Sequence, residues 1–206
     1  TLDIKDFATQ ILFGSTLKDK LTPFETLTIE PFTALKETPL YPNRPNQLKF
    51  SAKDKTLNAY PSLHQLEKDP WQRGLVLHYF ANHELLALEI MALTILKFPN
   101  APEIFLRGLA YTMLEEQDHM NRYIQGMQNF GIDFGELPVN DFFWKSLKNI
   151  NSPMDFVVQM SLTFEQANLD FAKQYLDLFL TFGDMATAAT LKKVYEDEIK
   201  HVAHGL

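Results

Sequence analysis

The chain has 206 residues, which is enough for one domain with a sizeable hydrophobic core. It contains no cysteine, so disulfides and thiolate metal sites are excluded, and any bound metal must be held by oxygen and nitrogen ligands. The formal net charge of -7 provides no general basic surface, and we therefore do not expect a nucleic-acid partner.

Residues 1–61 are predicted to form an N-terminal helix followed by a proline-rich arm. Residues 3–13 have helical periodicity, and Gly14 is placed to end that helix. In the rest of this segment prolines interrupt every longer pattern, which favours an extended arm. Large apolar side chains, including Phe24 and Phe50, indicate that the arm packs on the remainder of the protein. A flexible tail is the alternative.

Residues 62–206 are predicted to form an all-α bundle of four long helices with one long crossover. The helical patterns are separated by proline, glycine and aspartate turn signals, and they cover residues 71–97, 102–130, 152–182 and 185–204. The connections are therefore short, long and short. A short connection makes neighbouring helices antiparallel, whereas one of about twenty residues can cross the bundle from end to end.

Neither a membrane nor a secretory location is expected. The first twenty residues alternate charged and apolar groups, which is unlike a signal peptide. The most apolar stretch, residues 85–96, is too short to span a bilayer and contains Glu89. Because the chain also lacks cysteine, we expect a cytoplasmic protein.

Two Glu-x-x-His sequences carry the strongest chemical signal. Glu116 with His119 forms one pair, and Glu198 with His201 forms the other. The i, i+3 spacing places both side chains of a pair on the same face of a helix. The neighbours on these faces are mostly apolar, and a buried carboxylate or imidazole needs a partner, such as a metal ion. One such spacing arises easily by chance, but two on apolar faces are a stronger signal.

A lone glutamate precedes each pair at a similar distance. Glu84 precedes Glu116 by 32 residues, and Glu165 precedes Glu198 by 33. Each set would form one antiparallel hairpin, and two hairpins related by a pseudo-twofold axis would bring all these side chains together. Such an inward-facing set is typical of dimetal four-helix bundles. We therefore predict that two divalent metal ions are held by Glu84, Glu116, His119, Glu165, Glu198 and His201.

Axial position selects Glu84 over Glu89 as the ligand on the first long helix. The two lie about 7.5 Å apart along a helix, whereas the ions of a dimetal site are only about 3.5–4 Å apart. Counted from the turn of the first hairpin, Glu84 lies at the depth of Glu116 and His119, and Glu89 lies nearer the turn. We expect Glu89 to have a supporting or outward-facing role.

Further motifs extend over most of the chain. They are Leu12-Phe-Gly14, Lys20-Leu-Thr-Pro23, Pro42-Asn-Arg-Pro45, His83-Glu-Leu-Leu-Ala-Leu-Glu89, Phe134-Gly135, Pro138-Val-Asn140 and Asp197-Glu-Ile-Lys-His-Val202. With the Glu-x-x-His pairs, they resemble the ferritin-like diiron-carboxylate proteins, and more closely a bacterial ferritin-like family of largely uncharacterised function. The resemblance implies a ferritin-like four-helix bundle and a dimetal site with iron as the metal, with oxygen-dependent chemistry as one option.

The resemblance also gives roles to residues next to the ligands. In related bundles, a carboxylate at the position of Glu115 or Asp197 accepts the far ring N–H of the histidine in the opposite motif. Plain surface charge is the alternative. Tyr111, Tyr123 and Tyr195 are candidates for radical or hydrogen-bonding residues near the site, although core packing is the commoner role of such tyrosines.

The function that follows is a dimetal oxidoreductase, a monomer or homodimer that uses dioxygen to oxidise an unknown small molecule or modified base. One alternative is a non-catalytic metal-binding or ferroxidase-type protein, and another is a bundle that has lost its chemistry. The presence of all six ligand residues argues against lost chemistry. Carboxylate and imidazole ligands suit iron, manganese or a mixed pair, so the ligand set leaves the metal open.

Overall fold

Helices form nearly all of the regular secondary structure. The computed structural model describes residues 1–50, 60–160 and 166–204. Within these residues the only strands are β1 (Leu2–Asp3) and β2 (Leu27–Thr28), which pair in parallel. The protein is therefore all-α, as predicted.

The N-terminal segment contains more local structure than the proline pattern suggested. It begins with α1 (Ile4–Phe13), and the described part of the arm that follows contains the helix α2 (Leu17–Leu21) and the 3-10 helix η1 (Asn46–Leu48). α2 starts at a capping box, in which Thr16 and Asp19 each accept a hydrogen bond from the other's backbone N–H. This cap stabilises a helix that is too short to form on its own.

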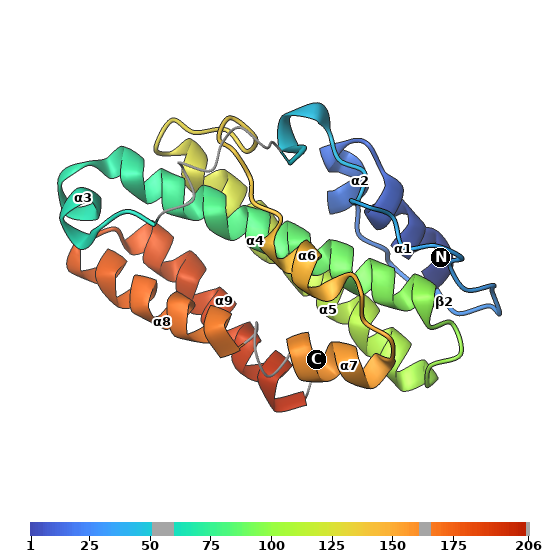
Figure 1. Ribbon diagram of the computed structural model, residues 1–206. Coiled ribbons are helices and arrows are strands. Elements are labelled where there is room, and N and C mark those ends of the chain that lie inside the picture. The colour runs from blue at the N-terminus through green and yellow to red at the C-terminus, as the bar shows by residue number, and fades with distance from the viewer. Residues whose placement is uncertain (51–59, 161–165, 205–206) are drawn as a thin grey trace.

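Four long helices form the main body as two hairpins. α4 (Pro70–Lys97) follows the short helix α3 (Leu63–Lys68) and packs along α5 (Glu103–Gln128). α8 (Gln166–Thr181) packs along α9 (Met185–His204). α5 also contacts α9, and this contact joins the two hairpins into one bundle (Figure 1).

The long connection between the hairpins contains two short helices, α6 (Phe142–Leu147) and α7 (Pro153–Gln159). α6 packs on α4. The sequence predicted one continuous helix over residues 152–182, and the structure has α7 and α8 at the two ends of this range. Residues 161–165, which lie between them, are outside the described part of the chain.

The turn of the second hairpin follows from local chemistry. Gly183 has a φ of 72°, a backbone conformation that favours glycine. The Asp184 carboxylate accepts a hydrogen bond from the Thr187 N–H at 3.0 Å, so it caps α9. In the first hairpin, the predicted helix over residues 102–130 begins one residue later, at Glu103, and Pro102 is its N-cap.

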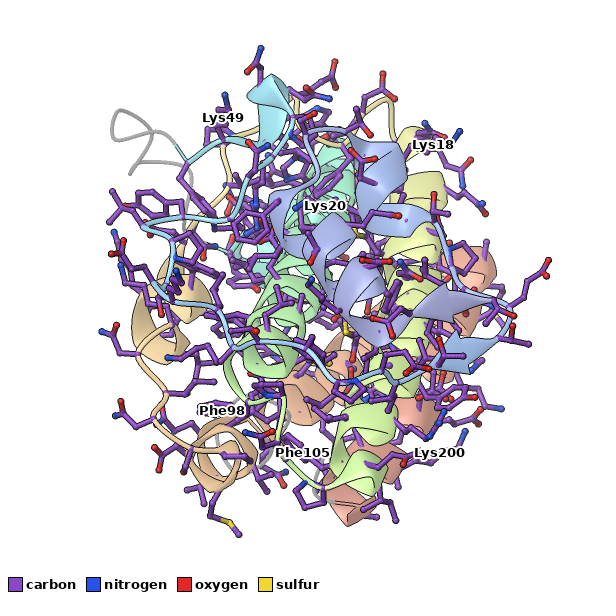
Figure 2. The ribbon with its side chains drawn as sticks, turned by 90° about the vertical axis from the view of Figure 1, so that its right-hand side faces the viewer. Lys18, Lys20, Lys49, Phe98, Phe105 and Lys200 are labelled. Atoms are coloured by element: carbon purple, nitrogen blue, oxygen red, sulfur yellow. The ribbon has the colours of Figure 1, made fainter. Side chains whose placement is uncertain are left out.

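α4 is the central element and is covered on nearly all sides. α1 packs directly on it, and Figure 2 shows the N-terminal helices lying over α4 and α5. α4 is long and apolar enough to cross a membrane, but 94% of its apolar window is buried inside the protein, as in the core helix of a soluble protein. Because α4 is buried over most of its length, each polar side chain in its buried part needs a partner within the protein.

Candidate metal centre

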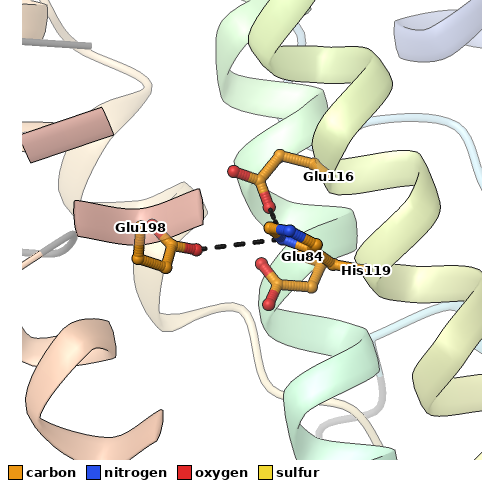
Figure 3. Close-up of side chains that lie close together, drawn as sticks. All are labelled: Glu84, Glu116, His119 and Glu198. Carbon is orange, nitrogen blue, oxygen red and sulfur yellow. Dashed lines mark hydrogen bonds and ion pairs between the residues drawn. The ribbon is translucent and has the colours of Figure 1, made fainter. Parts of the chain in front are cut away.

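Four buried side chains from three helices converge inside the bundle. Glu84 comes from α4, Glu116 and His119 come from α5, and Glu198 comes from α9 (Figure 3). One ligand atom of each residue lies within 4.8 Å of those of the others. Two ligand atoms on opposite sides of an ion, each about 2.1 Å from it, are about 4.2 Å apart. The spacing of the ligand atoms in this cluster is therefore close to that of a metal site.

His201 adds a second imidazole to this cluster. Its Nδ1 lies 3.2 Å from Glu198 Oε2 and 3.5 Å from Glu116 Oε1. The Nδ1 of His119 lies 3.2 Å from Glu116 Oε2 and 3.9 Å from Glu198 Oε1. Glu116 and Glu198 therefore each direct one oxygen toward each of the two imidazoles.

Carboxylates also contact the far side of both rings. His119 Nε2 lies 3.1 Å from Asp197 Oδ2, and His201 Nε2 lies 2.6 Å from Glu115 Oε2. Each carboxylate belongs to the opposite Glu-x-x-His helix, which is the arrangement expected from the sequence. A neutral histidine that donates its Nε2–H outward presents the Nδ1 lone pair to the cluster, the orientation that a ligating histidine needs.

Within the described residues, two buried carboxylate oxygens of the cluster, Glu84 Oε1 and Glu116 Oε1, accept no hydrogen bond. His201 Nδ1 lies at ion-pair distance from Glu116 Oε1, at 3.5 Å. An unsatisfied buried polar atom costs about 1–3 kcal/mol, and a charged one costs more. A cation between the carboxylates would pair with both oxygens, so the residues present fit a divalent metal ion.

The crowding of carboxylates changes their protonation. Burial, together with the charge of Glu198, raises the pKa of Glu84 to about 7. Burial and the charges of Glu84 and Glu198 raise the pKa of Glu116 to about 8. Desolvation opposes the charged form of His201, but its hydrogen bonds to Glu115 and Glu198 outweigh this and raise its pKa to about 10. Without a metal ion the cluster therefore retains protons near neutral pH.

Glu89 faces away from the cluster and toward the N-terminal segment. Arg44 donates to its carboxylate through Nη2 at 2.6 Å and Nε at 2.9 Å, and Lys20 Nζ lies 3.3 Å from it. All three residues are buried. The expected supporting or outward-facing role of Glu89 is therefore corrected. Glu89 is the anion of a buried ion cluster, because the N-terminal segment covers that side of α4.

Three contacts of this region could not be found from the sequence. Lys20 and Arg44 occur in the motifs that suggested the family, but no local period shows that they meet Glu89. Asn168 is buried and donates to Glu198 Oε1 at 2.8 Å, and nothing in the sequence distinguishes it from a surface asparagine. The predicted ligand Glu165 lies outside the described residues.

The three candidate tyrosines differ in position. Tyr123 is buried, and burial with the charges of the neighbouring carboxylates raises its pKa well above the ordinary value. Tyr111 is 53% exposed, and Tyr195 is half-buried. Of the three tyrosines, Tyr123 is therefore the one that lies near the metal-centre carboxylates Glu84, Glu116 and Glu198.

Comparison with known proteins gives one match. Residues 6–206 match a family described as "Protein of unknown function (DUF455)", so the similarity spans nearly the whole chain. No curated protein and no solved structure matched the chain. The relationship to ferritin-like proteins therefore stays a prediction that rests on the motifs and the order of the helices.

Proposed function

The chain belongs to the DUF455 family, and we propose that it is a dimetal-carboxylate oxidoreductase that binds two ions, uses dioxygen and oxidises a small molecule. The observation that carries this proposal is the sharing of two carboxylates between two imidazoles. Glu116 Oε2 lies 3.2 Å from His119 Nδ1, while its Oε1 lies 3.5 Å from His201 Nδ1. Glu198 divides its oxygens between the same two rings. A single ion would not need this division, whereas two adjacent ions do.

The two proposed metal positions have different ligands. His119 and Glu84 would hold the first, and His201 would hold the second together with Glu165, which lies outside the described residues. Glu116 and Glu198 each approach both imidazoles and would serve both positions. Four carboxylates and two divalent cations are together neutral, which is the condition for keeping this many charges in a buried site.

The protein contributes ligand geometry and exclusion of water to this chemistry. When bound, a pair of iron ions would supply electrons for the reduction of dioxygen. Asp197 and Glu115 hold the two imidazoles with Nδ1 toward the ions. All the described ligand residues are at most 3% exposed, so bulk water would be kept away from the ions. We further propose a cytoplasmic monomer or homodimer.

Metal content tests this proposal directly. After anaerobic loading with Fe²⁺, elemental analysis should give two ions per unmodified chain and at most one for Glu84→Ala. Glu196→Ala is the matched control, because it removes an exposed α9 carboxylate two residues before Glu198. It should retain two ions, and circular dichroism should show all three proteins folded.

Equal metal content in the three proteins would contradict the site. The reaction is tested separately, by mixing the loaded protein with dioxygen and following the oxidation of the ions by optical and Mössbauer spectroscopy. Loaded protein that stays reduced for hours would contradict oxygen-dependent chemistry and leave the metal centre intact. Elution as a large cage would instead favour a ferroxidase that stores iron.

A further inference from the structure

The carboxylate behind His119 is neutralised from the solvent side. Asp197 is 1% exposed, and its Oδ2 contacts both His119 Nε2 and the ammonium group of Lys193. Lys200 Nζ lies 2.9 Å from Asp197 Oδ1. Lys200 is labelled in Figure 2. These lysines are on α9, one turn before and one turn after Asp197 in the sequence. A single carboxylate thus faces two cations as well as the imidazole.

The carboxylate behind His201 has different surroundings. The Glu115 side chain is 43% exposed, and its Oε2 lies 2.6 Å from His201 Nε2. No lysine or arginine within the described ranges lies within 4.0 Å of this carboxylate, although Lys200 is near enough to sense its charge. The Glu115 charge therefore acts mainly on the imidazole.

This difference has a direct consequence for metal binding. A carboxylate that accepts the outer N–H of a ligating imidazole makes the inner nitrogen a stronger donor. Cations on that carboxylate weaken the effect and also repel a metal ion at the inner nitrogen. The His119 position experiences both effects. The His201 position has a carboxylate with no lysine or arginine of the described ranges within 4.0 Å, and a shorter hydrogen bond.

We propose that Lys193 and Lys200 make the two metal positions unequal, so that the position at His119 binds its ion more weakly and fills after the position at His201. The inference rests on the proposed dimetal function and names two residues that tune it without touching the ions. The ion at His119 receives less electron density from its imidazole, so it is the stronger Lewis acid and the more exchangeable ion.

Stepwise titration with Fe²⁺ under anaerobic conditions tests the inference on the full chain. Calorimetry should resolve two binding steps in the unmodified protein. Lys193→Met keeps a long unbranched side chain without the charge, and it should tighten the weaker step by about tenfold while leaving the tighter step in place. Glu115→Gln, which keeps an oxygen acceptor without the charge, should weaken the tighter step and so assign it to His201.

Lys192→Met is the matched control. Lys192 is the neighbouring residue on α9, it is exposed, and its ammonium group lies 3.8 Å from Glu196 and not beside Asp197. The change should alter neither step.

If Lys193→Met shifts both steps equally, or no more than Lys192→Met does, the inference is wrong while the dimetal function stands. Two ions that bind in one step to the unmodified protein would also overturn the inference alone. Fewer than two ions per unmodified chain would overturn both proposals.

Discussion

Two glutamates of one helix show how the surroundings of a side chain decide its role. Glu84 and Glu89 both lie on α4 and are both at most 1% exposed, so burial does not distinguish them. Glu89 faces the cations of Arg44 and Lys20. Glu84 faces other carboxylates and has an oxygen without a donor. Glu89 is thus paired by cations of the protein, whereas the carboxylates around Glu84 leave it an oxygen that a metal ion would pair.

Metal affinity should rise with pH through the neutral range. Without metal, the pKa values of about 7 for Glu84, about 8 for Glu116 and about 10 for His201 lie at or above neutral pH. Bound ions must displace these protons, so a higher pH reduces the competition. Calorimetric titration with Mn²⁺ between pH 6 and pH 8.5 should show increasing affinity and proton release to the buffer. Affinity that is constant over this range would show that the ligands are already deprotonated.

At the scale of an element, α4 has polar partners on two sides. Glu84 faces the metal centre, while Asn82 and Glu89 face the N-terminal segment, where Arg44 donates to both. Asn82 Nδ2 also donates to the Asn140 carbonyl at 3.1 Å. α4 thus connects the metal centre, the arm and the long connection through buried polar contacts.

Removal of Glu89 should destabilise the protein strongly. Glu89→Ala leaves Arg44 and Lys20 buried without their shared anion, and breaking a buried pair in this way costs about 3–5 kcal/mol. Equilibrium unfolding in guanidinium chloride measures the loss. Glu103→Ala is the control, because Glu103 pairs with Arg107 on the surface of α5 at 2.7 Å, and an exposed pair contributes about 0.3–0.5 kcal/mol. Similar small losses in both variants would show that the buried cluster is not needed for stability.

At the scale of the whole molecule, the metal centre links the two hairpins. Its ligands come from α4 and α5 in the first hairpin and from α9 in the second. In the absence of metal, the same crowded carboxylates can be accommodated only by retaining protons. Metal binding should therefore stabilise the packing of one hairpin on the other, beyond the local ordering of the ligands.

Metal should raise the melting temperature of the bundle. An ion present at 100 times its dissociation constant adds about 2.7 kcal/mol per site, which corresponds to roughly 5–10 °C for a chain of this length. Differential scanning calorimetry with Fe²⁺ or Mn²⁺, compared with a chelated sample, measures the shift. Glu84→Ala should show a smaller shift than the unmodified protein. A chelator that changes neither melting temperature nor metal content would contradict a structural role for the ions.

The sequence by itself determined the features that depend on helical periodicity. Residues three apart lie on one face of a helix, so Glu116 with His119, and Glu198 with His201, had to point the same way. Because a helix rises about 1.5 Å per residue, the distance of each residue from the turn of its hairpin can be calculated from the sequence. This distance distinguished Glu84 from Glu89 as the candidate ligand. The turn residues gave the helix ends to within a few positions, and the all-α class is confirmed.

Only the tertiary structure decided the contacts between segments that share no local period. The arm is largely aperiodic, so no spacing predicts that Arg44 and Lys20 reach Glu89. The two lysines beside Asp197 are visible at helical spacing, but their effect depends on Asp197 also contacting His119, on another helix. The physical reason is that burial and charge pairing are set by which surfaces meet, and a sequence pattern specifies a face of a helix without specifying what covers it.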